Sequence, residues 1–585
     1  MKILMISVAL GLAVTCQVNA QVSVGWDGSC DYDVSVNANS LQQAIDDGAT
    51  EIRLSNQNFH QTAIEITNNV IMKGGYADCT AANSDNQSNI NSVIDATGVG
   101  LPAVKIRAIT NAQVTLDSLT LQKGTGFNSG FSSDWAGGLS IDGVTGVVNL
   151  SHINLRDNAG IRGGGLAVIN FNATGSLLVT ANNLAIQNNT ASQGGGGLYC
   201  YAPESGFDLQ IDLGSASTIR NNHSDDHGGG MYVDQCSIKF NAGESSFVNS
   251  NIDKELFANS SHLSGGGIFA VSGAMLDLSG SSSASFDVFL NQANLDSNAN
   301  ATGGGINATG EGTVVNLING IVSSNTTGQY GGGLFASFDA VINMGRTINS
   351  CQYSDFCSQL TNNSNTGLSS GGGGAMAARY NGQINVKNTL IAYNNSEYDG
   401  YVLYSDPDGQ VLLEGNLMVE NGRHVDFDNY TAFYQNGNSV LTAAYNSITQ
   451  NNDSTILFRQ HSATSELRLY GNIVKSFANI YQGSSSITDI NCNLINDDSS
   501  IEVPTSNSII GMADFIDAGS MDYRLAETDT LAIDICNAGI YLPGDDLQGK
   551  SRGVDHPAVA DDLGPYDLGA YEFDDNDLIF KNDFE

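Results

Sequence analysis

The sequence has few basic residues. Lys and Arg together number 22 among 585 residues, against 61 Asp and Glu, so the formal net charge is −39. A field of this sign repels DNA, RNA and anionic membranes, so we expect no nucleic-acid partner. The acid excess instead suits a soluble surface, neutral or basic ligands, or bound cations, of which calcium is the one to test. Hydrophobic residues at 41% exclude wholesale disorder.

Long apolar stretches are also missing, except at the N-terminus. There Lys2 precedes an almost wholly apolar run over residues 3–14, which is too short for an ordinary transmembrane helix. With the small-residue site Val18-Asn19-Ala20, this run predicts a signal peptide over residues 1–20. No later stretch is long enough to span a membrane, so we expect no transmembrane segment. The sequence therefore predicts an exported protein, secreted or at the cell surface.

Several motifs of catalytic or cofactor chemistry do not occur. There is no serine elbow, no nucleotide fingerprint, and no Gly-Lys-Ser/Thr after any glycine block. No Cys-x-x-Cys spacing occurs, so a structural zinc site is not expected. No segment shows a convincing 3.6-residue hydrophobic period, which disfavours alternating strands and helices.

Eight cysteines remain once the signal peptide is removed. An even number in an exported chain favours disulfides, and sequential pairing is the simplest of about 105 connectivities. Cys200 and Cys236 fit this scheme least well, because they lie at different distances from their glycine blocks. The expected bonds are Cys30–Cys79, Cys200–Cys236, Cys351–Cys357 and Cys492–Cys536.

What the sequence does contain is a repeat. Seven times a hydrophobic residue is followed by two spacers, an Asn, a short polar run and a block of three or four glycines. Recurrence of this kind predicts a solenoid, in which each coil contacts only its neighbours. The anchor residues are Asn158, Asn189, Asn222, Asn259, Asn298, Asn325 and Asn363. The glycine blocks are Gly163–Gly165, Gly194–Gly197, Gly228–Gly230, Gly265–Gly267, Gly303–Gly305, Gly331–Gly333 and Gly371–Gly374.

The residues upstream of each anchor alternate between apolar and polar. Val148 and Leu150, then Ile153 and Leu155, lead to Asn158. This period of two predicts short strands with one buried face, joined by bends and paired in parallel with the next coil. Asn tolerates left-handed backbone geometry, and its amide can hydrogen-bond to an Asn above and below. The glycines let adjacent coils approach closely.

This repeat resembles the right-handed parallel β-helix proteins. Over residues 110–460 it is similar to the repeat of the polymorphic outer-membrane protein family of bacterial surface proteins. The segment 41–45, Leu-Gln-Gln-Ala-Ile, and Gly74-Gly75-Tyr76 before Cys79 resemble the start of such proteins. The resemblance implies an all-β fold, a right-handed single-stranded parallel β-helix (solenoid) with N- and C-terminal caps.

The C-terminal region resembles the choice-of-anchor type of domain found on bacterial β-helix proteins. The matching pieces are residues 531–534, 545–549, Arg552 and 567–572. The expected organisation is a signal peptide (1–20), an N-terminal cap with first coils (21–105), β-helix repeats (106–480), a choice-of-anchor-like region (481–573) and an acidic tail (574–585).

Two clusters are candidates for function. His223, Asp225, Asp226 and His227 offer four metal-binding side chains within five residues, but their spacing matches no defined motif, and a solvated loop is the alternative. Tyrosines crowd a second stretch and suit sugar stacking or protein contact, the alternative being packing of loops onto the coil. These tyrosines are Tyr393, Tyr398, Tyr401, Tyr404, Tyr430 and Tyr434.

The function favoured by these observations is adhesion or glycan binding at the cell surface or outside the cell, without catalysis. A long rod displays a large surface and needs no single active centre. We expect a monomer with a polysaccharide or cell-surface partner. The alternative is a polysaccharide lyase or glycoside hydrolase of the pectate-lyase-like fold, which needs acids and a base on adjacent coils. A third possibility is a purely structural spacer.

Overall fold

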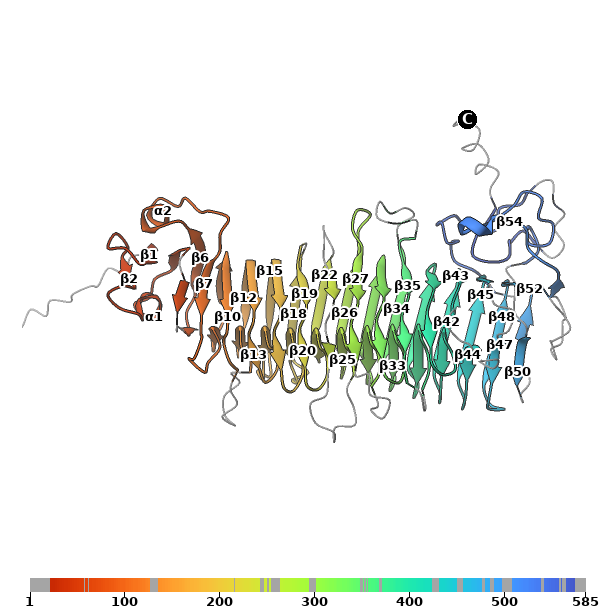
Figure 1. Cartoon of the computed structure of the whole chain (residues 1–585), viewed down its shortest axis with the longest axis horizontal. Coiled ribbons are helices and arrows are strands. Elements are labelled where there is room, and N and C mark those ends of the chain that lie inside the picture. Colours follow the sequence, from red (N-terminus) through yellow and green to blue (C-terminus); the bar gives the residue numbers. More distant parts are fainter. Residues whose placement is uncertain are drawn as a thin grey trace, which may run out of the picture.

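The chain forms a long rod of stacked coils (Figure 1). In this computed structural model, strands account for 48% of the chain and helices for 3%, and the long sheets are parallel. The predicted all-β parallel β-helix is thereby confirmed. The structure describes residues 21–56, 58–60, 63–126, 135–214, 216–241, 247–249, 252–253, 264–293, 301–347, 351, 354, 356–367, 371–422, 431–449, 456–475, 479–483, 489–496, 508–537, 541–556, 559 and 564–573. The predicted signal peptide and acidic tail lie outside these residues.

Two faces of the coil belong to one sheet, which has 31 strands in the described part of the chain. The strands β12 and β15 are long enough to cross from the first face to the second, and they join the two. The first face contains β1 (Gln21–Gly25) with its neighbour β2 (Tyr32–Asp33), β3 (Glu51–Ser55), β6 (Ile71–Tyr76), β9 (Ala112–Asp117), β12 (Gly146–Arg156), β15 (Gly175–Gln187), β18 (Phe207–Leu213), β22 (Ser237–Asn241), β26 (Met275–Ser279), β30 (Val314–Ile318), β34 (Val341–Gly345), β38 (Gln383–Lys387), β42 (Gln410–Glu414), β45 (Val440–Ala444), β48 (Glu466–Tyr470) and β51 (Asp489–Asn491).

The second face follows each first-face strand after a bend. In the two long strands the bend is a single residue with a left-handed backbone. This residue is His152 in β12 (φ 52°) and Asn183 in β15 (φ 55°). Besides parts of β12 and β15, this face contains β4 (Asn58–His60), β7 (Ser92–Asp95), β10 (Leu119–Gln122), β19 (Thr218–Arg220), β23 (Phe247–Asn249), β27 (Phe286–Phe289), β31 (Gly320–Ser323), β35 (Gln359–Thr361), β39 (Leu390–Ala392), β43 (Leu417–Val419), β46 (Ser447–Thr449), β49 (Ile473–Lys475), β52 (Leu494–Ile495) and β53 (Ile509–Ile510).

The third face is a separate parallel sheet, of 14 strands in the residues described. The strands from β14 to β33 begin directly after a glycine block, so on these coils the block sets where the chain turns onto this face. It contains β5 (Ile64–Ile66), β8 (Val104–Arg107), β11 (Leu139–Asp142), β14 (Leu166–Ile169), β17 (Leu198–Tyr201), β21 (Met231–Asp234), β25 (Ile268–Val271), β29 (Ile306–Thr309), β33 (Leu334–Ser337), β37 (Met376–Arg379), β41 (Leu403–Ser405), β44 (Thr431–Gln435), β47 (Ile456–Gln460) and β50 (Asn479–Gly483).

Two-residue strands line the corner between the second and third faces. Each follows an Asn in the sequence, as β13 follows Asn158, and pairs with the short strand of the neighbouring coil. Before β24 and β28 this Asn is Asn251 and Asn291, not the predicted anchors Asn259 and Asn298. This corner sheet contains β13 (Ala159–Gly160), β16 (Thr190–Ala191), β20 (His223–Ser224), β24 (Ile252–Asp253), β28 (Gln292–Ala293), β32 (Thr326–Thr327), β36 (Ser364–Asn365) and β40 (Asn395–Ser396).

The interior of the coil is a continuous stack of aliphatic side chains. The register is residue by residue, so Val148 lies beside Val179 and Ile153 beside Leu184 on the next coil. These side chains are buried in a cluster that runs from Val22 to Ile495. Because each buried aliphatic side chain stabilises the fold by about 1.5–3 kcal/mol, this stack is the main source of stability.

The N-terminal end of the rod is covered by helix α1 (Ser40–Asp46) (Figure 1). Its buried residues Leu41 and Ile45 belong to the same apolar cluster as the coil interior. Helix α2 (Cys79–Asn83) packs against β1 and β3, and the disulfide between Cys30 and Cys79 fixes it there. No helix in the described part of the chain is both long and apolar enough to cross a membrane.

The C-terminal domain lies against the side of the last coils (Figure 1). It contains the antiparallel pair β54 (Phe515–Asp517) and β55 (Asp522–Leu525) and a short 3₁₀ helix, Ala518–Ser520. It contacts the second face, where the outward side chains Leu390, Leu417 and Ile473 join its apolar cluster. On the preceding coil the outward positions are polar, namely Gln359 and Thr361 of β35.

All four expected disulfides are present, which confirms the sequential pairing. Cys200 and Cys236 join neighbouring coils, and Cys492 and Cys536 tie the last coils to the C-terminal domain. The coil also extends beyond residue 480, because β51, β52 and β53 continue its parallel pairing.

Candidate functional site

The anchor asparagines form a buried ladder along one corner of the rod. Asn325 shows the pattern: its Oδ1 accepts hydrogen bonds from the backbone N–H and the Nδ2 of Asn291, at 3.0 and 2.9 Å. Its own Nδ2 donates to Asn363 Oδ1 at 3.0 Å and to the carbonyl of Val288 at 2.8 Å. The same bonds link Asn158, Asn189 and Asn222, and link Asn363, Asn394 and Asn421. These asparagines thus hold the coils together and stay away from solvent.

Two of the predicted anchors, Asn259 and Asn298, lie outside the described residues. In the coil that contains Asn298, the residue bonded to Asn325 is Asn291. The left-handed backbone expected at the anchors falls one residue earlier, at positions such as Leu290 (φ 57°) and Ser324 (φ 56°). The last glycine packs on the ladder in five of the blocks, at Gly165, Gly197, Gly267, Gly305 and Gly333. A side chain at Gly305 would come within 3.0 Å of Asn325 Nδ2.

A second asparagine ladder, not found from the sequence, runs along the bend between the first and second faces. Asn416, Asn446, Asn472 and Asn493 repeat the same amide-to-amide bonds, at 2.9–3.0 Å. No glycine block follows these residues, so the repeat motif does not mark them. The signal available in the sequence is the Asn before each of Leu417, Ser447, Ile473 and Leu494.

The His223–His227 cluster divides into two separate pairs. His223 Nε2 lies 2.9 Å from Asp225 Oδ1, and His227 Nε2 lies 3.3 Å from Asp226 Oδ1. His227 Nδ1 accepts the backbone N–H of Ser264, and its ring stacks on Phe269 at 4.5 Å. In the described residues, the one group of three ligand-type side chains with atoms within 4.8 Å is Asp27, Cys30 and Cys79, and both of these cysteines form a disulfide.

The outer surface of the third face carries aromatic side chains in register on successive coils. Tyr199 of β17 lies beside Tyr232 of β21, which lies beside Phe269 of β25. Their ring centroids are 5.1 and 5.0 Å apart. Farther along the same column, Tyr404 and Tyr434 stack at 4.9 Å with an angle of 11° between their planes. Parallel strands place equivalent side chains about 4.8 Å apart, which is the spacing at which rings stack.

The first aromatic platform consists of Trp135, Phe171, Tyr199, Tyr201 and Tyr232. Phe171 is 51% exposed and contacts Trp135 edge to face at 6.4 Å. The guanidinium of Arg162 lies 4.6 Å from the Trp135 ring and donates to the Tyr199 hydroxyl at 3.2 Å.

An acidic side chain borders the first aromatic platform. Burial raises the pKa of Asp234, at the end of β21, to about 6, although a Ser272 hydrogen bond and Arg162 act in the opposite direction. Burial likewise raises the pKa of Asp226, and Arg162 again opposes it.

The second aromatic platform consists of Tyr330, Phe338, Tyr380, Tyr404 and Tyr434. Phe338 and Tyr380 are 55% and 39% exposed, and their rings stack at 4.9 Å with 14° between the planes. Both residues have a left-handed backbone, with φ of 51° and 49°. A left-handed conformation is unusual for a bulky side chain.

Charged residues surround the second aromatic platform in pairs. Arg379 stacks on Tyr330 at 4.2 Å and on Tyr380 at 4.8 Å, and its Nε donates to the carbonyl of Asp406. Arg459 Nη1 lies 3.0 Å from Asp399 Oδ1. Burial raises the pKa of Asp399, and the Arg459 charge opposes that rise. The platform therefore offers ring faces, hydroxyls and charge-balanced polar groups.

The tyrosines singled out in the sequence have different surroundings. Tyr404 and Tyr434 belong to the second aromatic platform, whereas Tyr401 is 1% exposed and packs in the interior. Tyr398 is exposed, and the Tyr393 hydroxyl contacts Met521 Sδ in the C-terminal domain. Tyr430 lies outside the described residues.

Comparison with protein-family models, with curated proteins and with solved structures found no match for this chain. The resemblance to polymorphic outer-membrane repeats and to choice-of-anchor domains therefore depends on the sequence motifs alone.

Proposed function

We propose that this chain is an exported β-helix protein that binds a polysaccharide at the cell surface or outside the cell, without cleaving it. The observation that carries the proposal is the exposed pair Phe338 and Tyr380. Two solvent-facing rings stacked on neighbouring coils offer the flat apolar surface on which a sugar ring packs.

Folding does not require rings at these two positions. A residue held in the left-handed region costs about 1–3 kcal/mol, and an exposed ring recovers little of this by burial. On an earlier coil the corresponding turn contains Ser272 (φ 58°), so a small polar residue is accommodated there. Left-handed residues recur at the bends of this coil, so the exposure of the two rings, more than their backbone, supports a binding role for Phe338 and Tyr380.

The regular spacing of the third face suits a linear polymer. Neighbouring coils are about 4.8 Å apart along the rod axis, so a chain that lies parallel to the axis crosses several coils. The column of rings is interrupted at Asn307 and Ala377, so the rings form two separate platforms along this path. Several weak contacts with one polymer reinforce each other, because each bound contact holds the polymer close to the next one. The net charge of −39 favours a neutral or basic polysaccharide over a polyanion on this open surface.

The cations of the second aromatic platform support binding more than catalysis. Proton abstraction needs a base with a pKa near the working pH, whereas a guanidinium remains protonated. Arg379 is stacked between rings and Arg459 is paired with Asp399. Both side chains therefore serve as donors that orient a ligand. The polysaccharide experiment described below distinguishes binding from cleavage by a lyase or glycoside hydrolase.

We also propose that this chain is related to two known groups of proteins. The Asn and glycine motifs support a pectin lyase-like coil related to polymorphic outer-membrane repeats. The motifs in residues 531–572 support a choice-of-anchor type of domain. The predicted signal peptide supports secretion or display at the cell surface, where we propose that the protein acts in adhesion as a monomer.

A panel of immobilised neutral, basic and acidic polysaccharides tests this function. The mature protein is applied in calcium-containing buffer, and both retention and new reducing or unsaturated chain ends are scored. Retention on neutral or basic polymers without new ends is the expected result. New chain ends would replace the binding proposal with a catalytic one, and no retention on any polymer would favour a structural spacer.

A further inference from the structure

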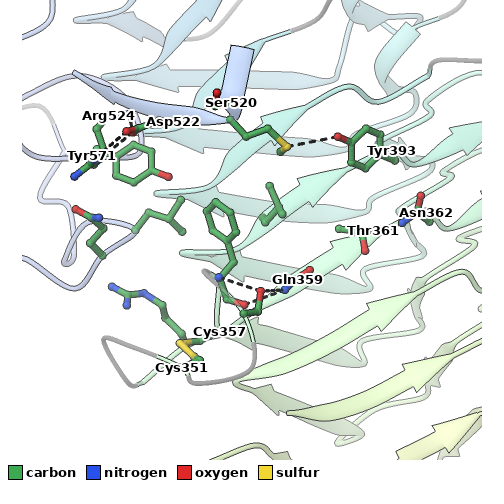
Figure 2. Close-up of a pocket in the computed structure, with 17 residues that line it drawn as sticks. Cys351, Cys357, Gln359, Thr361, Asn362, Tyr393, Ser520, Asp522, Arg524 and Tyr571 are labelled. Atoms are coloured by element: carbon green, nitrogen blue, oxygen red, sulfur yellow. Dashed lines mark hydrogen bonds and ion pairs between the residues drawn. A yellow bond between two sulfur atoms is a disulfide. The ribbon is translucent and has the colours of Figure 1, made fainter. Parts of the chain in front are cut away.

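We infer that a second ligand site lies between the coil and the C-terminal domain, and that it takes a sugar residue bearing a carboxylate. The site is a cavity of about 810 Å³, separate from the third face. Figure 2 shows Arg524, Asp522 and Tyr571 of the domain on one side, and Gln359, Thr361 and Asn362 of the coil across from them. The inference does not depend on the proposed function.

The charged side chains that line this cavity have a positive excess. Arg346 comes from the coil, Arg524 comes from the C-terminal domain, and Asp522 is the one acid among the lining residues. Two other cavities in the described part of the chain, of about 500 and 640 Å³, have acidic linings by comparison. The excess applies to the lining alone, because the charges of Asp545 and Asp546 also act on Arg346. The two guanidinium groups are the charged donors through which this cavity would recognise an anion.

The two arginines are held in place by different contacts. Arg346 Nη2 donates to the carbonyl of Asp546 at 2.8 Å. Burial lowers the pKa of Arg346, while the Asp546 and Asp545 charges oppose that shift. Arg524 forms a two-pronged contact with Asp522, with Nε to Oδ1 at 2.9 Å and Nη2 to Oδ2 at 2.7 Å. A guanidinium matches a carboxylate through paired N–H donors. At Arg524 those paired donors already hold Asp522, so a ligand carboxylate binds the remaining Nη1 or competes with Asp522.

A buried acceptor indicates that the ligand also carries hydroxyls. The side-chain Oε1 of Gln548 lines the same cavity, is buried, and accepts no hydrogen bond from the described residues. This oxygen has almost no exposed surface, so a ligand's donor reaches it only when the Gln548 amide turns toward the cavity. A sugar hydroxyl is such a donor.

The remaining walls suit the face of a sugar ring. Phe356 and Tyr571 present aromatic surface, and the Tyr393 hydroxyl is held by Met521 Sδ at 3.5 Å. The volume falls within the range of about 300–1,000 Å³ that is typical of small-ligand sites. Distant acidic groups weaken an anion's binding little, because charges are screened beyond about 8 Å at physiological salt. A carboxylated sugar satisfies the arginines, the Gln548 oxygen and the rings together.

Binding of D-glucuronate, compared with D-glucose, tests this inference by ligand-observed NMR and thermal shift on the full mature protein. The two sugars differ in the carboxylate, so glucuronate should bind about tenfold or more tightly, given about 1.5–3 kcal/mol for charged hydrogen bonds. Arg524→Gln should abolish the preference, because it removes one guanidinium and leaves Asp522 behind. Asp522→Asn should strengthen glucuronate binding. Gln548→Leu should weaken both sugars.

Control variants separate this site from the third face and from misfolding. Arg220→Gln removes an exposed arginine that pairs with Gln187 on β15, and it should leave glucuronate binding unchanged. A Phe338→Ser and Tyr380→Ser double variant should also bind glucuronate normally, whatever happens to polysaccharide retention. Equal binding of the two sugars, binding of neither, or an Arg524→Gln variant that keeps the preference would each overturn the inference.

Discussion

The rings of Phe338 and Tyr380 stack 4.9 Å apart on neighbouring coils, and both residues hold a left-handed backbone. Each follows its third-face strand at the same offset, after Ser337 of β33 and Arg379 of β37. The solenoid therefore converts two separate turns of the sequence into one exposed aromatic surface. A surface of this kind depends on the register between coils.

The buried asparagine ladder should be essential for stability. Asn325→Ala removes the side-chain bonds to Asn291 and Asn363 and the donor to the Val288 carbonyl. We expect a loss of at least about 2 kcal/mol, since each buried group without a partner costs about 1–3 kcal/mol. Denaturant unfolding followed by circular dichroism measures this loss.

The matched control for the ladder is Asn316→Ala. Asn316 also bonds to neighbouring coils, through Asp277 and Asn343, but on the outer surface of the rod. Water can replace those bonds, so the unfolding midpoint should move much less than in Asn325→Ala. Equal shifts of the unfolding midpoint in the two variants would show that burial of the ladder adds nothing to its contribution to stability.

Stability should depend on pH through Asp234. Burial raises its pKa in the folded protein to about 6, above its ordinary value of 3.8. A carboxyl with a raised folded-state pKa contributes stability below pH 3.8, and this contribution is lost as the pH rises through about 6. Asp234→Asn should therefore melt at a higher temperature than the wild type at neutral pH, with a difference that shrinks in acid. Thermal unfolding across this pH range measures it, and a constant difference would contradict the assignment.

The four disulfides should contribute unequally. Cys492 and Cys536 are separated by 44 residues, whereas Cys351 and Cys357 are separated by 6. Loop-closure entropy predicts a cost of about 4 kcal/mol for removing the first bond and about 2 kcal/mol for the second. Calorimetry of the two double-alanine variants measures the loss of stability in each. A larger loss on removal of Cys351–Cys357 would contradict the predicted order.

Much of the coil was predictable because its signals are local and repeated. Three patterns reflect what the backbone of the coil requires. The alternation before Asn158 reflects a strand with one buried face, the anchor asparagines reflect the bends, and the glycine blocks reflect the close approach of coils. The even cysteine count and simple pairing also sufficed for the disulfides. The ladder that includes Asn416 was missed, because its asparagines precede ordinary strands and no glycine block marks them.

The candidate sites were harder to predict, because they depend on which coils lie side by side. Phe338 and Tyr380 are 42 residues apart and match no motif; they meet only through the register of β33 and β37. The C-terminal domain packs against the side of the coil, and one feature of the sequence indicates this. The outward-facing residues Leu390, Leu417 and Ile473 are apolar. That signal is visible only once the outward positions of the second face are known.

The most direct test of the glycan-binding account is polysaccharide retention by a Phe338→Ser and Tyr380→Ser double variant. Serine is tolerated at φ 58° in Ser272, so the coil should fold and melt normally. The control is Leu290→Ser, which removes an exposed apolar side chain from another left-handed position, at φ 57°. The double variant should lose retention on the polymer that holds the wild type, while Leu290→Ser should keep it. Undiminished retention by a folded double variant would contradict it.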